Sequence, residues 1–227
     1  MIVQTTALPR HTLVWPRTSA HAALAAQAND AEARAAVAAW IQAGRPFVVR
    51  RQDEGVRARD DTVALGLPLP PAQRKRRLAF TLARSDVGRH APPRTLAWIA
   101  ASLPARWHGP LAALDRAARA HGATLRGFGA AAWQAQTGLA YLHDGSDVDV
   151  VFHPAAMEQI DAVLGVFARF ERAHRLRVDA EIVFPGEAAV AWREWHAAPL
   201  RVLAKSSRGP ALHSRAALAE LLSAAAA

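Results

Sequence analysis

Two aspartates separated by a single residue are the side chains of this chain best suited to chemistry. Asp147 and Asp149 begin the run Ser146–Phe152 (SDVDVVF), which predicts a buried β-strand. Strand side chains alternate between faces, so the two acids share one face while Val148 and Val150 point into a core. Adjacent carboxylates raise each other's pKa, and a divalent cation removes that cost. Hard oxygen ligands suit Mg²⁺, so the pattern predicts a Mg²⁺ site; a solvated strand end without a metal is the alternative.

A glycine turn lies upstream of the two acids. Gly127-Phe128-Gly129 follows a short apolar run and precedes a helix-like segment. Such a turn exposes backbone N–H groups and the positive end of a helix, and both favour phosphate. Ser146, directly before the acids, is a further candidate for substrate binding. A phosphate-binding turn followed by an Asp-x-Asp strand is the layout of a nucleotidyltransferase active site, although a lone Gly-x-Gly is a weak signal.

A second acidic strand is predicted over residues 175–184 (RLRVDAEIVF). Asp179 and Glu181 share one of its faces, and apolar residues occupy the other. Nucleotidyltransferases take a third carboxylate from a strand beside the Asp-x-Asp strand, and either acid could supply it. Asp179 is slightly preferred because its side chain is shorter and more rigid. The remaining acid would then pair with Arg175 or Arg177.

Longer motifs around these residues carry a family resemblance. The segments GFGAAAWQAQTGLAYLHDGSDVDVVF and RVDAEIVFPGEAAVAWREW resemble the holo-acyl-carrier-protein synthase of malonate decarboxylase, a family also called phosphoribosyl-dephospho-CoA transferase. The likeness continues upstream in HTLVW, GRPFVVRR and GLPLPPAQRKRRLAF. It covers about residues 10–205, and the motifs are specific as a set.

The resemblance implies a reaction and a ligand set. The prosthetic group would pass from 2′-(5″-triphosphoribosyl)-3′-dephospho-CoA to a serine of the apo acyl carrier protein subunit of malonate decarboxylase, with release of pyrophosphate. Asp147, Asp149 and Asp179 would hold Mg²⁺, and Glu181 is the alternative third acid. The family is expected to have Gly-Ser at the turn, whereas Ala130 follows Gly129 here. Backbone phosphate contacts would survive that change, but one side-chain contact would be lost.

Composition places the chain among cytoplasmic proteins. It has 227 residues and no cysteine for disulfides or thiolate metal sites, and its sequence predicts neither a signal peptide nor a transmembrane span. The net charge is +9, of which residues 1–90 contribute +7 with 14 Lys or Arg and 7 Asp or Glu. A basic half indicates an acidic partner such as a polyphosphate or an acidic carrier protein. Two other functions stay open: a nucleotidyltransferase that uses an ordinary NTP, and a non-catalytic nucleic-acid-binding protein.

The densest positive charge follows a stiff proline segment. Arg74, Lys75, Arg76 and Arg77 come directly after Pro68–Pro71 and lead into a predicted strand. Four cations in a row repel one another, so they could bind the donor's phosphates or the acidic carrier. A solvated strand end is the equally ordinary interpretation.

The elements needed to position these residues predict an α/β (α+β) fold. A smaller basic α/β domain over residues 1–90 would precede a nucleotidyltransferase-like mixed sheet with flanking helices over 91–227, with the boundary near Pro92-Pro93. Asn29 or Asp30 would cap a helix that ends near Gly44, and residues 1–28 would be irregular. Trp192 and Trp195 are interpreted as core residues, with stacking on an adenine as the alternative. The other predicted helices cover residues 95–103, 110–121, 130–136, 154–174 and 214–227, and the other predicted strands cover 46–51, 63–67, 78–83 and 124–128.

Overall fold

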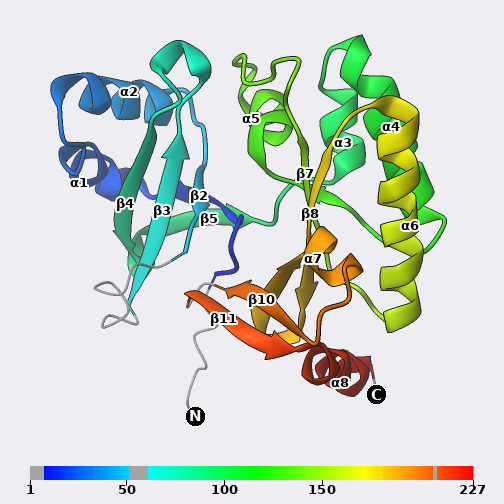
Figure 1. Ribbon diagram of the computed structural model, residues 1–227. Coiled ribbons are helices and arrows are strands. Elements are labelled where there is room, and N and C mark those ends of the chain that lie inside the picture. The colour runs from blue at the N-terminus through cyan, green and yellow to red at the C-terminus, as the bar shows by residue number, and fades with distance from the viewer. Residues whose placement is uncertain (1–7, 52–60, 207–208, 227) are drawn as a thin grey trace. The chain divides into compact units, whose positions relative to one another are not determined.

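The computed structural model describes residues 8–51, 61–206 and 209–226 (Figure 1). The chain divides into two compact units, of which the first extends to Pro92 and the second begins at Pro93. Both mix helices with a β-sheet, as expected for an α/β protein. None of the helices in the described ranges is both long enough and apolar enough to cross a lipid bilayer.

The first unit contains a five-stranded sheet in the order β4-β3-β2-β1-β5, and all of its pairs are antiparallel. Buried Phe47 and Phe80 meet edge to face in its core, with their ring centroids 5.5 Å apart. Helix α2 begins as predicted, because the Asp30 side chain accepts a hydrogen bond from the N–H of Ala33 at 2.7 Å. The elements of this unit are β1 (Leu13–Pro16), α1 (His21–Ala26), α2 (Ala31–Gln42), β2 (Phe47–Val49), β3 (Thr62–Pro68), β4 (Arg77–Ala83) and β5 (Val87–Ala91), with short 3-10 turns at Thr18–Ala20, Pro71–Gln73 and Arg84–Asp86.

The expectation that residues 1–28 are irregular is wrong for the part that the structure describes. Strand β1 and helix α1 both lie there, and strand β5 was also not predicted. Strand β5 is an edge strand whose middle residues are exposed, so it lacks the alternation of apolar and polar residues that marks a strand in sequence. The antiparallel pairing with β1 determines its structure instead.

The second unit contains a six-stranded sheet in the order β11-β10-β9-β8-β7-β6. Strands β7 and β8 are parallel, and β6 and β9 flank them in antiparallel pairings. The elements are α3 (Leu96–Ala101), α4 (Ala105–Arg119), β6 (Arg126–Gly127), α5 (Gly129–Thr137), β7 (Val148–Phe152), α6 (Met157–His174), β8 (Val178–Phe184), β9 (Ala188–Ala191), α7 (Trp192–His196), β10 (Arg201–Ser206), β11 (Gly209–Ser214) and α8 (Arg215–Ala226), with a 3-10 turn at Pro185–Glu187.

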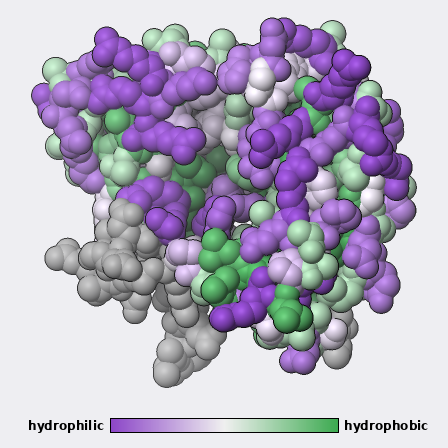
Figure 2. Space-filling view, viewed as in Figure 1, coloured by the Kyte–Doolittle hydropathy of each residue, from purple (hydrophilic) through white to green (hydrophobic). Residues whose placement is uncertain are grey.

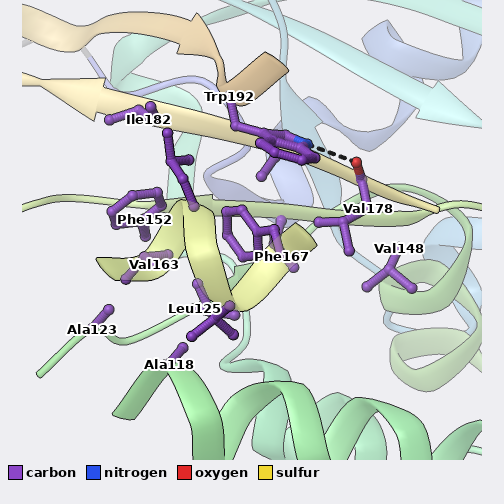
Figure 3. Packing of buried hydrophobic residues seen from close by; sticks show 14 of the residues in the cluster. Ala118, Ala123, Leu125, Val148, Phe152, Val163, Phe167, Val178, Ile182 and Trp192 are labelled. Carbon is purple, nitrogen blue, oxygen red and sulfur yellow. Dashed lines mark hydrogen bonds between the residues drawn. The ribbon is translucent and has the colours of Figure 1, made fainter. Parts of the chain in front are cut away.

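The core of this unit lies between the sheet and its helices. Val148, Val150 and Val178 are at most 1% exposed and belong to one cluster with residues of α3, α4 and α6 (Figure 3). The interpretation of Trp192 and Trp195 as core residues is confirmed, since they are 3% and 1% exposed. The predicted faces of β7 are therefore right: Val148 and Val150 fill the core, and Asp149 lies on the opposite face together with Val151.

The main differences from the predictions in this unit are the start of α4 and four elements, β9, α7, β10 and β11, that lie where no helix or strand is predicted. Helix α4 begins at Ala105 rather than at Pro110, which lies within the helix. The sequence predicts a start at Pro110 because prolines favour first helical turns, but Pro110 lies inside α4. The alanine-rich strand β9 (Ala188–Ala191) was missed, because alanine has little strand preference; its three buried residues show that tertiary packing decides its conformation.

Candidate active site

The register of the two parallel strands brings the predicted acids together. Asp149 of β7 lies directly beside Asp179 of β8, and Glu181 lies beside Val151. Asp147 precedes β7 by one residue and is two positions from Asp149. Paired residues of neighbouring strands have side chains on the same face, so Asp149, Asp179 and Glu181 share one side of the sheet. Asp179 is exposed, whereas Glu181 is only 9% exposed.

The glycine turn packs directly against Asp149. The N–H of Phe128 donates to the Asp149 carbonyl at 3.1 Å, and Gly127 pairs with Val150 in the sheet. Gly129 begins helix α5 with a φ of +64°, and a Cβ atom there would overlap the Asp149 carboxylate. Only glycine combines this conformation with so close an approach. The predicted glycine turn and the Asp-x-Asp strand therefore form one structure.

The Asp149 carboxylate lies at the N-terminus of helix α5. It accepts a hydrogen bond from the backbone N–H of Ala130, which favours the charged form. Burial opposes this and is the largest effect, followed by the negative charges of Asp179 and Asp147. Together these raise the pKa of Asp149 from 3.8 to about 7. The site therefore contains more negative charge than its surroundings neutralise.

Asp147 and Ser146 have different surroundings. The Asp147 carboxylate is 3.8 Å from the Arg177 guanidinium, and its side chain is 37% exposed. Ser146 is 7% exposed, and its hydroxyl oxygen accepts the N–H of His143 at 3.0 Å, while its own N–H donates to the His143 carbonyl. Ser146 thus holds the turn that leads into β7, and its role as a substrate contact stays a prediction.

The acids fit a hard divalent cation by their chemistry. Three carboxylates on adjoining strand positions are ligands that Mg²⁺ prefers, and their repulsion is the cost that a cation relieves. In the described parts of the chain, no three His, Cys, Asp or Glu side chains are already gathered around a common metal position. The Mg²⁺ site at Asp147, Asp149 and Asp179 therefore stays a prediction.

Gln134, which the sequence does not mark as important, positions the segment that leads into β7. The Gln134 side chain of α5 accepts hydrogen bonds from the N–H groups of Tyr141 at 3.0 Å and Leu142 at 2.9 Å. Its contacts fix the segment between α5 and the acidic strand. A single glutamine in an alanine-rich helix carries no sequence signal for such a role.

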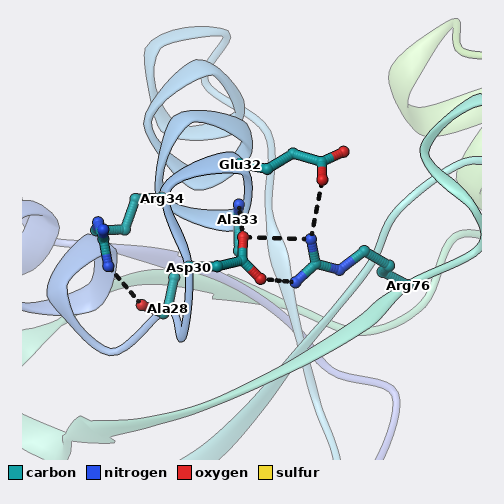
Figure 4. Close-up of polar contacts among 6 residues, drawn as sticks. All are labelled: Ala28, Asp30, Glu32, Ala33, Arg34 and Arg76. Atoms are coloured by element: carbon teal, nitrogen blue, oxygen red, sulfur yellow. Dashed lines mark hydrogen bonds and ion pairs between the residues drawn. The ribbon is translucent and has the colours of Figure 1, made fainter.

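The basic run lies in the first unit and is partly neutralised there. The Arg76 guanidinium contacts the Asp30 carboxylate at 2.6 Å and that of Glu32 at 3.6 Å, at the start of α2 (Figure 4). The hydrogen bond from Arg76 lowers the pKa of Asp30. Arg74, Lys75 and Arg77 are exposed. Arg76 therefore has a structural partner, and a role in ligand binding for the other three stays a prediction.

Comparison with known proteins identifies the family. The family model described as phosphoribosyl-dephospho-CoA transferase MdcG C-terminal domain matches residues 95–216, and the corresponding N-terminal domain model matches residues 9–93. The chain belongs to this transferase family. It is therefore an enzyme, as expected from the resemblance in sequence.

Individual members of the family support the same assignment over nearly the full length. The chain is 40% identical to a phosphoribosyl-dephospho-CoA transferase of Xanthomonas euvesicatoria over 216 residues, which cover 95% of this chain and 99% of that protein. It is 34% identical to a protein of the same name from Bradyrhizobium diazoefficiens over 197 residues, or 87% and 86% of the two chains. No solved structure matches the chain.

Proposed function

We propose that this enzyme transfers the 5″-phosphoribosyl-dephospho-CoA group from 2′-(5″-triphosphoribosyl)-3′-dephospho-CoA to a serine of the apo acyl carrier protein subunit of malonate decarboxylase. The names of its relatives support the donor class, and the family link to malonate decarboxylase supports the acceptor. The observation that carries the proposal is the placement of Asp149, which lies against a helix N-terminus and beside a second aspartate. A helix N-terminus suits phosphate, and clustered carboxylates suit a cation bound to a polyphosphate.

The reaction is an in-line displacement at the α-phosphorus of the donor. The serine oxygen forms a bond to this phosphorus, the bond from phosphorus to the bridging oxygen breaks, and pyrophosphate leaves. The backbone N–H groups at the start of α5 hold phosphate oxygens of the donor. One of these groups, that of Ala130, donates to the Asp149 carboxylate in this structure. The third carboxylate of the site, Asp179 or Glu181 of β8, accepts the proton of the serine hydroxyl. A general base needs only to lie within hydrogen-bond distance of the group that it deprotonates.

Asp147, Asp149 and Asp179 are the residues that would hold Mg²⁺. The ion would supply neutralisation of the triphosphate charge and stabilise the leaving oxygen. Asp179 is preferred over Glu181 as the third ligand for two reasons. It is the direct neighbour of Asp149 in the sheet, and its charge affects the pKa of Asp149 more than the charge of Glu181 does.

The decisive test is the intact mass of the carrier subunit. Incubation with enzyme, donor and Mg²⁺ should add the mass of the phosphoribosyl-dephospho-CoA group, and pyrophosphate should appear in equal amount. ATP in place of the donor should give neither product. Pyrophosphate release with ATP and a simple acceptor would instead support an ordinary nucleotidyltransferase, and an unmodified carrier under all conditions would refute the proposed reaction.

Amide variants test the individual acids. Asp147→Asn and Asp179→Asn should each slow transfer about a thousandfold, because a metal ligand contributes several kcal/mol to the barrier. Asp161→Asn, at an exposed position of α6, is the matched control and should retain full activity. Glu181→Gln should lose little. If it loses as much as Asp147→Asn while Asp179→Asn remains active, Glu181 is the third ligand.

A further inference from the structure

The first residue of β8 lacks a strand partner on one side. Strand β9 pairs only with residues 181–184 of β8, so it ends before reaching Val178. On the other side, β7 pairs with Val178 through Val148. Backbone groups that point away from β7 at this position must therefore find partners outside the sheet, since buried N–H and C=O groups are rarely left unpaired.

Three side chains supply those partners. The Val178 N–H donates to the Glu171 carboxylate of α6 at 2.6 Å, and the Val178 carbonyl accepts the Trp192 indole N–H at 2.9 Å (Figure 3). The Arg193 guanidinium also approaches this carbonyl at 3.4 Å. Helices α6 and α7 thus replace, with side chains, the missing continuation of β9.

The three side chains are also joined to one another. Arg193 forms an ion pair with Glu171 and lies over the Trp192 ring, 4.5 Å from its centroid. Trp192 is 3% exposed and meets Phe167 of α6 edge to face, with 5.6 Å between the ring centroids. Packing therefore restricts the rotamer of the tryptophan, and the ion pair restricts the other two side chains.

The next residue along β8 is Asp179, which faces Asp149. The Asp179 side chain is exposed, so packing around the carboxylate does little to hold it in place. Its position relative to Asp149 depends on the backbone of β8, which Glu171, Trp192 and Arg193 hold at the preceding residue. We propose that Glu171, Trp192 and Arg193 are positioning residues, here called the Val178 clamp, that place Asp179 opposite Asp149 for binding of the cation. This inference rests on the proposed function, because it assigns a purpose to the Asp179 carboxylate.

Two tryptophans of the same short helix provide a matched pair of variants. Trp192→Phe keeps a buried ring and removes the hydrogen bond to Val178. Trp195→Phe removes an equally buried indole, 1% exposed, whose N–H has no hydrogen-bond partner among the described residues. The two substitutions delete the same atoms from the same helix, and they differ in whether the Val178 clamp is broken.

The primary measurement is stabilisation by Mg²⁺, followed as the rise in Tm during a titration of the full chain. The Mg²⁺ concentration at half-maximal stabilisation should rise about tenfold in Trp192→Phe, the usual effect of losing a group that orients a metal ligand. In Trp195→Phe it should stay within about twofold of wild type. Glu171→Gln keeps an acceptor for the Val178 N–H but loses the ion pair with Arg193, so it should give an intermediate shift. It also replaces Trp192→Phe should that variant fail to fold.

A second measurement does not depend on a metal. Hydrogen exchange of peptides that cover residues 177–181 should be faster in Trp192→Phe than in Trp195→Phe, because the end of β8 opens more readily. Equal exchange and equal Mg²⁺ response in the two variants would overturn the proposal. A loss of Tm in Trp192→Phe that is the same with and without Mg²⁺, with unchanged exchange in β8, would also overturn it and leave a purely structural contact.

Failure of the proposed function has a different signature. In that case wild type leaves the carrier unmodified with donor and Mg²⁺, and if the proposed metal site also fails, wild type shows no Mg²⁺ stabilisation. The exchange measurement then decides alone whether the Val178 clamp holds β8 beside β7. If wild type responds to Mg²⁺ through Asp179 but Trp192→Phe behaves as wild type, the proposed site stands and the clamp is refuted.

Discussion

Replacing Asp149 with asparagine should make the metal-free protein more stable at neutral pH while abolishing transfer. Burial and the charges of Asp179 and Asp147 raise the pKa of Asp149 to about 7, against an ordinary value of 3.8. The ionised carboxylate is therefore costly in the folded protein. Asparagine keeps the shape and an oxygen acceptor for the Ala130 N–H, but it carries no charge.

The direction in which folding stability changes with pH follows from proton binding to Asp149. Between pH 4 and pH 7 the folded protein retains the Asp149 proton and the unfolded chain has lost it, so folding stability falls as the pH rises. The stability that this proton provides is fully present below the unfolded pKa and is lost as the pH passes the folded pKa. A difference of three pKa units corresponds to about 4 kcal/mol, and with partial solvent screening we expect about 2–4 kcal/mol at pH 8.

Urea unfolding at pH 4.5 and pH 8, in the presence of a chelator, measures this difference. Between pH 4.5 and pH 8 the free energy of unfolding should fall by about 2–4 kcal/mol more in wild type than in Asp149→Asn. Asp161→Asn, on the exposed face of α6, should follow wild type. At pH 8, Mg²⁺ should raise the free energy of unfolding of the wild-type protein, and it should change that of Asp149→Asn little.

One result would refute the reasoning. If Asp149→Asn is less stable than wild type at pH 8 without metal, the Ala130 N–H and the helix end outweigh burial and repulsion. The carboxylate would then be a stabilising cap for α5. The interpretation of the site as an excess of unneutralised negative charge would be wrong.

Three further predictions concern the glycine turn and the basic run. Ala130→Ser should bind the donor about tenfold tighter in calorimetry, since a hydroxyl bonded to a charged oxygen contributes about 1.5–3 kcal/mol; unchanged binding would mean that the backbone already compensates. Gly129→Ala should lose more stability in urea than Gly138→Ala, because both glycines have positive φ but only the Cβ at residue 129 meets Asp149; equal losses would show that backbone conformation alone matters. Arg74→Ala with Arg77→Ala should raise KM for the carrier and weaken its salt dependence if these residues dock an acidic protein, whereas a raised KM for the donor would place them at the phosphates.

The two acidic strands, β7 and β8, could be predicted from sequence because the spacing of their acids follows the alternation of side chains along a strand. The alternation in Ser146–Phe152 predicts that Val148 and Val150 are buried and that Asp149 lies on the other face, and the structure agrees. The glycine turn was recognisable because positive φ favours a specific residue type. The pairing of Asp149 with Asp179 was not, since the register between parallel strands depends on packing across the sheet.

Other features of the two units depend on contacts between residues distant in the chain. Arg76 was grouped with three neighbouring cations, yet its partner Asp30 is 46 residues away. The Trp192 indole was correctly interpreted as buried, but its hydrogen bond to Val178 depends on where β9 ends. Residue type predicts burial in such cases, and only the fold determines the partner.

Asp149 lies at the point where the proposed cation and the proposed donor phosphate would meet. In the metal-free protein its carboxylate accepts the Ala130 N–H, at the helix end where a phosphate oxygen of the donor would bind. A cation held by Asp147, Asp149 and Asp179 would neutralise the repulsion among these acids. It would also offset the repulsion between the acids and a phosphate at the N-terminus of α5. Donor and cation should therefore bind with positive coupling.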